Sequence, residues 1–308
     1  MTNASVVLDI ATLDVTYPNG TNALRGVSLR VGTGERLAVI GESGCGKTTI
    51  ARTILGLLPS GSRVAGSAIV AGSDVLALSE RSHRRLRGTT IGYVAQSPYD
   101  AMNPLWSVER NVAEAWRAVG CQPPTGHVVA ALERLGINDA AARIRQRPFA
   151  WSGGMLQRAA IAAATAHRPA LLVADEPTSA LDAELASDIL ELLGSTSVAL
   201  LIITHDVHLV AQHVHRIVVC YAGRIVEDRA ALDICEQPRH PYTRALLAAR
   251  IEPGRPLGVP LDGDPPDLSQ PIVGCSFAPR CPVAVERCLT EQPGLVDGVA
   301  CHVVNDRG

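Results

Sequence analysis

Lysine is almost missing from this chain of 308 residues: Lys47 is the single lysine, and the other 27 of the 28 strongly basic residues are arginines. Aromatic residues are also few, with two Phe, five Tyr and three Trp, and the formal net charge is −2 at pH 7. The chain therefore lacks both the stacking rings and the basic surface with which proteins bind nucleic acid without sequence preference. We expect no nucleic-acid partner.

Long apolar runs are missing too. No stretch approaches the ~20 residues with which a helix spans a bilayer, and Met1–Val6 lack the basic residues that open a signal peptide. We therefore expect a cytosolic protein that does not itself cross a membrane. In that compartment eight cysteines indicate thiols or metal ligands rather than disulfides. The 47% of apolar residues is ample for a globular core, which excludes a disordered chain.

The single lysine lies in a glycine-rich segment that fits the pattern Gly-x-x-x-x-Gly-Lys-Ser/Thr of a phosphate-binding loop, Gly41-Glu42-Ser43-Gly44-Cys45-Gly46-Lys47-Thr48. A compact ammonium can be wrapped by such a loop while it touches phosphate oxygens, whereas a guanidinium is planar and wider. The loop follows a predicted buried strand, Arg36–Ile40, and precedes a predicted helix, Thr49–Leu58, as the motif requires. Unpaired N–H groups at a helix start attract anions, so we predict a site for a nucleoside triphosphate.

The rest of the chain predicts an α/β fold around this loop. Val6–Val70 alternates short apolar runs with Gly, Asn and Pro turns, which is typical of antiparallel strands. Leu171–Ala174 and Val198–Ile203 are uniformly apolar and each is followed by a helical segment, which indicates parallel strands buried on both faces of a sheet. Ala222-Gly223 predicts a hairpin turn.

Two other regions differ in character. Residues 97–150 form a predicted helical insert, because three stretches there carry helical spacing: Ser107–Val119, His127–Gly136 and Asn138–Arg145. Proline and glycine accumulate from Pro238 onward, and residues 252–308 hold too few large apolar side chains to form a core unaided.

Further motifs narrow the chemistry. The strand Leu171–Ala174 ends in two acids, which places Asp175 where it can hold Mg²⁺ and Glu176 where it can polarise a water molecule. Trp151-Ser152-Gly153-Gly154-Met155-Leu156-Gln157 opens a predicted helix, with Ser152 as its cap and glycines that let backbone N–H groups approach a phosphate. Three polar residues complete the set, each after a strand or after the acidic pair: Gln96, Asp182 and His205.

In this order and spacing the chain resembles the ATP-binding subunits of ABC transporters over roughly residues 5–235. The resemblance implies a phosphate-loop ATPase core, in which a mixed sheet with flanking helices joins an antiparallel β subdomain and the helical insert at about 97–150. The segment at Ser152 corresponds to the family's Leu-Ser-Gly-Gly-Gln signature, from which it differs at Trp151 and Met155.

The resemblance also implies a role for each motif. Tyr17 would stack on adenine, and the loop with Lys47 and Thr49 would hold the phosphates. Thr48, Gln96 and Asp175 would coordinate Mg²⁺, Glu176 would act as general base, and His205 would contact the γ-phosphate. The signature residues Ser152, Gly153 and Gly154 would hold the ATP of a second subunit, and Asp182 would lie at the subunit interface.

A second resemblance lies in the tail, so we divide the chain into an ATPase domain, 5–235, and a C-terminal extension, 236–308. Pro238–Leu247 looks like the segment that follows the ATPase core in oligopeptide, dipeptide and nickel importers, and the later cysteines are similar to the same family's terminal set. This implies two permease partners, an extracytoplasmic solute-binding protein and a second ATPase, identical or different. The chain would bind peripherally at the cytoplasmic face of the cell membrane.

Several functions stay open. We favour the ATP-hydrolysing motor of a di- or oligopeptide importer, and the same family also includes importers of nickel or another small solute. A soluble ABC-type ATPase that acts on nucleic acid would be expected to carry paired cores, a coiled coil or basic appendages, which are missing here. A metal-storage or redox protein would rest on the cysteines alone and would leave the phosphate loop unexplained.

The cysteines carry two expectations. Cys275, Cys281, Cys288 and Cys301 are separated by five, six and twelve residues with no tight Cys-x-x-Cys pair, so a [4Fe-4S] cluster is favoured over structural zinc or free thiols. Such a cluster would order the proline-rich tail, because metal binding and folding are coupled. Cys45 lies at a helix start beside Lys47, so we expect an accessible thiol with a lowered pKa.

Overall fold

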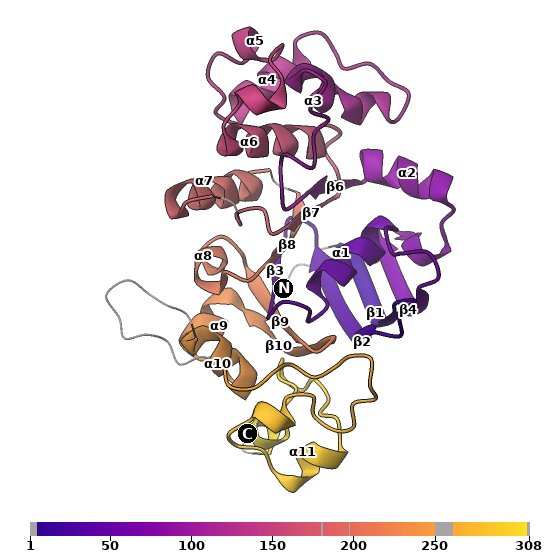
Figure 1. Cartoon of the computed structure of the whole chain (residues 1–308), viewed down its shortest axis with the longest axis vertical. Helices are drawn as coiled ribbons and strands as arrows, with labels where there is room; N and C mark the ends of the chain where they lie inside the picture. The colour runs from indigo at the N-terminus through magenta and orange to yellow at the C-terminus, as the bar shows by residue number, and fades with distance from the viewer. Residues whose placement is uncertain (1–4, 180, 197, 250–260, 307–308) are drawn as a thin grey trace.

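The computed structural model describes residues 5–179, 181–196, 198–249 and 261–306. The molecule is elongated, with a group of helices at one end, two sheets in the middle and the C-terminal extension at the other end (Figure 1). This arrangement places the phosphate loop near the middle, within reach of the extension. The mixed α/β architecture confirms the predicted fold class.

The first sheet is antiparallel and has the spatial order β2-β1-β4-β5. One face of β1 packs into the core through Leu8 and Ile10, and then through Leu13 and Val15. The strict alternation shifts at Thr12, which has a positive φ of 45° and lies at a β-bulge. The strands are β1 (Val6–Thr16), β2 (Asn22–Gly32), β4 (Arg63–Val70) and β5 (Ser73–Asp74).

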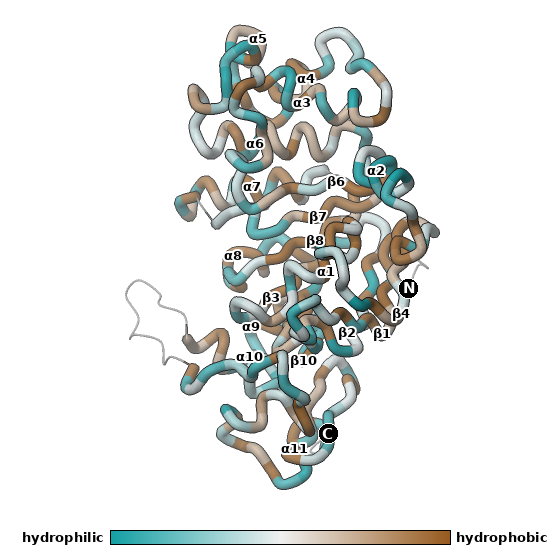
Figure 2. The backbone as a smooth tube through the Cα atoms, turned by 45° about the vertical axis from the view of Figure 1, so that its right-hand side comes forward, coloured by the Kyte–Doolittle hydropathy of each residue, from teal (hydrophilic) through white to brown (hydrophobic). Residues whose placement is uncertain are grey.

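The second sheet has the order β10-β9-β3-β8-β7-β6 and is parallel except for β10. Every residue of β7 and β8 is buried, which explains why both sequences are apolar up to the last residue, Asp175 in β7 and Thr204 in β8 (Figure 2). Ala222 and Gly223 both have positive φ and join β9 to β10, so the predicted hairpin is confirmed. The strands are β3 (Arg36–Ile40), β6 (Ile91–Val94), β7 (Leu171–Asp175), β8 (Ala199–Thr204), β9 (Arg216–Tyr221) and β10 (Arg224–Ala230).

Helices cover both faces of the second sheet, and α1 lies between the two sheets (Figure 1). The three helices predicted between residues 97 and 150 are α3, α4 and α5, each somewhat shorter than expected. Among the described residues no helix has the length and apolarity to span a bilayer. The helices are α1 (Lys47–Leu55), α2 (Glu80–Thr89), α3 (Val108–Arg117), α4 (His127–Arg134), α5 (Ala140–Arg143), α6 (Gly153–Ala164), α7 (Ala183–Gly194), α8 (Val207–Ala211), α9 (Ala231–Glu236), α10 (Pro241–Ala248), α11 (Glu286–Thr290) and α12 (His302–Asn305), with 3₁₀ turns η1 (Val75–Ala77), η2 (Pro148–Ala150) and η3 (Ala278–Arg280).

The C-terminal extension shares the core of the second sheet. Phe277 is fully buried, and its ring centroid lies 5.3 Å from that of Tyr221 and 5.4 Å from that of Tyr242. The backbone also docks on β10, because the Ala300 N–H donates to the Val226 oxygen at 2.9 Å. The expectation of a segment with no core of its own covered 252–308, of which residues 252–260 and 307–308 lie outside the described part. The described remainder of this segment packs against the second sheet and does not form a separate core.

Candidate nucleotide-binding site

The phosphate loop joins β3 to α1 and depends on glycine for its shape. Gly41, Gly44 and Gly46 have φ of 149°, 79° and 109°, which side-chain-bearing residues rarely adopt. A Cβ on Gly41 would lie 2.1 Å from the Cys220 oxygen, and a Cβ on Gly46 would lie 2.6 Å from the Ala23 oxygen. The loop is therefore packed closely on β9 and β2, and neither glycine can carry a side chain there.

Lys47 begins α1 and is buried inside the curve of the loop. Its Nζ donates to the oxygens of Gly41 at 2.7 Å and Glu42 at 2.9 Å. Gly46 caps the helix without a side-chain hydrogen bond, so no side chain competes for the amide N–H groups that open α1. An ammonium and helix-start amides at one place form an arrangement that can hold phosphate oxygens.

Oxygen ligands for a divalent cation meet at the end of β7. Asp175 is buried there, and the Thr48 hydroxyl donates to its Oδ1 at 3.5 Å. Burial raises the pKa of Asp175, and the nearby Glu176 charge adds to this, while Thr48 and Lys47 act in the opposite direction. Hydroxyl and carboxylate oxygens suit Mg²⁺, and Gln96, which follows β6, lines a pocket that Thr48 also lines.

Glu176 stands where β7 leaves the sheet, with a positive φ of 49° and its N–H bonded to the Ile203 oxygen. Its carboxylate is mostly buried and lies 2.9 Å from Nδ1 of His205, so the imidazole donates to the carboxylate. The His205 ring is 69% exposed. A carboxylate held by an imidazole at the rim of a pocket can accept a proton from water.

One pocket of about 810 Å³ brings these groups together. Tyr17 borders it, with its hydroxyl 2.9 Å from that of Thr49. Asp175 and three loop residues, Gly41, Glu42 and Cys45, lie behind this lining rather than in it. The lining is Tyr17, Asn19, Thr21, Ala23, Ser43, Gly44, Gly46, Lys47, Thr48, Thr49, Arg52, Gln96, Glu176, His205 and Leu268.

The signature residues do not line this pocket. Ser152 caps α6, as predicted, by accepting the backbone N–H three residues later at 3.3 Å. An added Cβ on Gly154 would meet Cδ2 of Leu185 at 2.6 Å, so the end of that leucine side chain would have to shift, whereas Gly153 has open space. Asp182 caps α7, and both Ser152 and Asp182 are exposed. The structure thus presents this segment outward, away from the chain's own phosphate loop.

The expected iron–sulfur cluster at the four C-terminal cysteines finds no support in the described part of the chain. They lie near one another, and burial, reinforced by the other three sulfurs, raises the pKa of Cys275 to about 11. Among the described residues, however, no group of three or more His, Cys, Asp or Glu side chains is arranged to hold a metal ion. Two of the thiols are buried and two are partly buried against apolar side chains, in the order Cys288, Cys301, Cys275 and Cys281. The extension is held on the sheet by the ring of Phe277 and by backbone hydrogen bonds between the extension and β10.

Cys45 meets one expectation and corrects another. A hydrogen bond with Cys220 lowers the pKa of Cys45, and Lys47 adds to this effect against that of burial. The side chain is only 5% exposed, so the thiol is not accessible as expected. Strand β9 lies against the loop at this point, because Cys220 Sγ donates to the Cys45 carbonyl oxygen at 3.0 Å.

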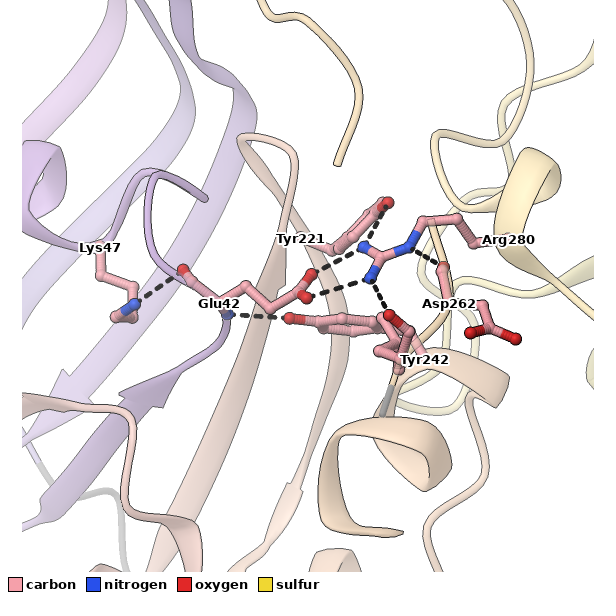
Figure 3. A network of polar contacts seen from close by, with 7 residues as sticks. Glu42, Lys47, Tyr221, Tyr242, Asp262 and Arg280 are labelled. Atoms are coloured by element: carbon pink, nitrogen blue, oxygen red, sulfur yellow. Dashed lines mark hydrogen bonds and ion pairs between the residues drawn. The ribbon is translucent and has the colours of Figure 1, made fainter. Parts of the chain in front are cut away.

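Three residues of the extension that no sequence motif predicted also reach this site. Arg280 binds the Glu42 carboxylate with both terminal nitrogens, at 2.8 and 3.1 Å (Figure 3). Tyr242 accepts the Glu42 N–H at 2.9 Å, and Leu268 lines the pocket. No local pattern could have revealed these contacts, because 238 residues separate Glu42 from Arg280.

The fold and this site define a phosphate-loop nucleotide-binding protein of the cassette type. Residues 24–179 match the family described as ABC transporter, and residues 226–288 match the oligopeptide/dipeptide transporter C-terminal region. The chain therefore belongs to the ABC transporter family, in its oligopeptide/dipeptide branch.

Individual relatives agree with this assignment. The probable peptide ABC transporter ATP-binding protein y4tR of Sinorhizobium fredii is 41% identical over 307 residues, 95% of this chain and 92% of that protein. The oligopeptide transport ATP-binding protein OppD of Mycobacterium tuberculosis is 39% identical over 97% of this chain, which spans only about half (51%) of OppD. A dimeric, post-hydrolysis structure of the ATP-binding cassette MJ0796 with ADP and Pi has a TM-score of 0.64 and 25% identity, and the likeness covers 73% of this chain and 98% of that chain.

Proposed function

We propose that this chain is the ATP-hydrolysing subunit of an importer for di- or oligopeptides. The observation that carries the proposal is the single pocket in which Lys47, Thr48, Gln96, Glu176 and His205 meet. The peptide assignment is supported by the names of the relatives and by the C-terminal family match. The chain's own residues do not select the solute, since the family's solute crosses through the permeases.

Nucleotide would bind with its phosphates over the loop and its base toward Tyr17. Lys47 and the amides at the start of α1 would hold the phosphate oxygens, and Thr49 would support Tyr17 through their hydroxyl contact. Thr48, Gln96 and Asp175 would hold Mg²⁺, which would offset the charge of the phosphates when bound.

Glu176 would act as the general base. Water attacks the γ-phosphorus, the carboxylate accepts its proton, and the bond to the bridging oxygen of ADP breaks, so that ADP and phosphate are the products. His205 keeps the carboxylate in place through the 2.9 Å contact. The ring is largely exposed and can also approach the γ-phosphate.

A second ATPase subunit would complete the site. Ser152, Gly153 and Gly154 lie outside the chain's own pocket, and Asp182 is exposed. We propose that they face the nucleotide of the partner, whether that partner is identical or different. The dimeric arrangement of the MJ0796 cassette supports a shared site.

The permeases would contact the side of the molecule near Gln96. A hollow of about 390 Å³ lies between α2, β6, α3 and α6 and is lined in part by Arg87, Tyr93 and Glu114. Two apolar side chains of the segment after Gln96 are strongly exposed, Tyr99 at 54% and Leu105 at 73%. Such a surface suits a docked partner. A permease bound there would be coupled, through the nearby Gln96, to the presence of the γ-phosphate in the pocket.

The remaining assignments follow from this assembly. The protein would lie peripherally at the cytoplasmic face of the membrane, and an extracytoplasmic binding protein would deliver the peptide. We keep the division into an ATPase domain, 5–235 with its helical insert at about 97–150, and an extension, 236–308. The C-terminal family match, which begins at residue 226, supports a change near that boundary.

Reconstitution tests this function. The chain should co-purify with its permeases, and in proteoliposomes peptide-loaded binding protein should stimulate ATP hydrolysis and peptide uptake together. Nickel in place of peptide is the contrasting solute. ATP hydrolysis that responds to nickel and not to peptide would reassign the substrate, and failure to bind ATP at all would refute the motor function.

A further inference from the structure

The C-terminal extension reaches the candidate nucleotide site at two separate points. The first is Arg280, whose side chain is 5% exposed and whose guanidinium pairs with both oxygens of the Glu42 carboxylate, as Figure 3 shows. Its other donors are also used: Nε donates to the backbone carbonyl oxygen of Asp262 at 2.9 Å, and Nη1 donates to the Tyr221 hydroxyl at 3.3 Å. A buried, bidentate pair with so many partners fixes the geometry of both side chains.

Glu42 is part of the phosphate loop and is held on three sides. Arg280 holds its carboxylate, Tyr242 accepts its N–H at 2.9 Å, and its carbonyl oxygen accepts the Lys47 ammonium at 2.9 Å. A single residue therefore links the guanidinium of the extension to the ammonium of the loop (Figure 3). If Arg280 were lost, the Glu42 carboxylate would have to move to find water or another donor.

The second point is at the start of β2, in the pocket that Tyr17 also lines. Leu268 lines the pocket there, and its backbone oxygen accepts the Asn22 N–H at 2.8 Å. Arg25 of β2 fastens the same stretch of the extension, with donors to Ser276 at 2.9 Å and to the Ile272 oxygen at 3.3 Å. An apolar side chain in this position can cover the face of a base but offers nothing to a phosphate.

We infer that the C-terminal extension completes the nucleotide site: Arg280 is a positioning residue that holds the phosphate loop through Glu42, and Leu268 contacts the base. This inference rests on the proposed function of the pocket as an ATP site. The alternative is that the Arg280 pair only staples the extension to the core. If Arg280 positions the loop, its loss should weaken the binding of phosphate groups in particular. If it is only a staple, its loss should not distinguish ATP and ADP from AMP.

Arg280→Gln should act on the phosphates. Without the pair, the binding-competent loop is populated for only part of the time, and the apparent affinity falls by that fraction. We expect the Kd values for ATP and ADP to rise about tenfold, with KM raised and kcat at saturating ATP near that of the wild type. AMP lacks the β-phosphate that the loop holds, so its Kd should not change.

Leu268→Ala should act on the base instead. It removes an apolar contact that every adenine nucleotide shares, so the Kd values for ATP, ADP and AMP should all rise by about threefold. The two variants therefore give different patterns across the same three ligands. Arg287→Gln is the matched control, because Arg287 also belongs to the extension but pairs with Glu291 on the surface.

The experiment measures binding of fluorescent ATP, ADP and AMP to the full chain with Mg²⁺, with thermal unfolding as the check on folding. Glu42→Gln breaks the same pair from the loop side and keeps the test open if Arg280→Gln does not fold. The double variant should bind ATP no more weakly than either single variant, because both substitutions remove the same interaction. Arg280→Lys should recover only part of the loss, because an ammonium cannot form the bidentate pair.

Two outcomes would overturn the inference while leaving the proposed function intact. If Arg280→Gln binds ATP and ADP as the wild type does, or weakens AMP equally, Arg280 does not position the loop. If Leu268→Ala changes no Kd, the extension does not contact the base. A wild-type chain that binds no ATP would instead refute the proposed function itself.

Discussion

Two glycine-rich segments open helices in this chain, the phosphate loop before α1 and the signature segment before α6, and they differ in what surrounds them. The loop is enclosed at both ends: Gly41 abuts β9, Gly46 abuts β2, and Lys47 is buried. The signature segment is open: Gly153 has no neighbour within 4 Å of an added Cβ, and Ser152 is exposed. The loop therefore encloses its lysine within one chain, whereas the signature segment, under the proposed function, would act on the nucleotide of a partner.

This difference sets the order of effects among substitutions. Changes in the loop should remove nucleotide binding from the isolated chain. Changes at the end of β7 should spare binding and remove chemistry. Changes in the signature segment should appear only when two subunits meet, because that segment contributes nothing to its own pocket.

The largest effect is expected for Lys47→Ala. It removes the only ammonium of the site and should weaken ATP binding by at least about a hundredfold, with the loss of hydrolysis as a consequence. Equilibrium binding of fluorescent ATP is the measurement. Retention of wild-type affinity would show that the phosphates bind elsewhere, and Arg287→Gln controls for the loss of a positive charge in general.

Glu176→Gln should separate binding from chemistry. The amide keeps the shape and a hydrogen bond to His205 but cannot accept a proton, so we expect ATP binding to persist while kcat falls by about 10²–10⁴. Steady-state ATP hydrolysis and the accumulation of an ATP-bound complex are the readouts. Turnover at the wild-type rate would exclude Glu176 as the base.

The loop and the strands could be predicted because their signals are local. Lys47 with its glycines lies within eight consecutive positions, and β7 is buried at every residue, so its apolar run was unambiguous. Arg280 was missed because its partner is 238 residues away. The expectation of a metal at Cys275 and its neighbours finds no support among the described residues, because spacing along a loop-rich segment does not by itself determine how the fold arranges each thiol.

Gly153→Asp tests whether the signature segment lies at the subunit interface. An added side chain has room at Gly153, so folding and ATP binding by the isolated chain should be unchanged. If the segment faces the partner's γ-phosphate, the new carboxylate repels it, and hydrolysis by the assembled pair should fall about tenfold. Gly153→Ala is the control for size. An equal loss in both variants would point to packing rather than charge.

The smallest effect is expected at Cys45, where the enclosed loop limits what a reactive thiol can do. Hydrogen bonding with Cys220 lowers the pKa of Cys45, so its thiolate should form at lower pH than that of Cys275, whose pKa is raised to about 11. Burial opposes this advantage, because only transient opening of the loop lets a reagent reach the sulfur. We therefore expect slow alkylation that inactivates ATP hydrolysis.

The measurement needs a Cys121→Ser background, because Cys121 is exposed and would react first. Inactivation by N-ethylmaleimide should then be slow, should accelerate as pH rises toward the pKa of Cys45, and should be prevented by Mg-ATP, which would hold the loop closed. A further Cys45→Ser change should abolish the inactivation. If that protein is inactivated at the same rate, the reactive thiol lies outside the loop, and the enclosure seen around Lys47 extends to Cys45 in solution as well.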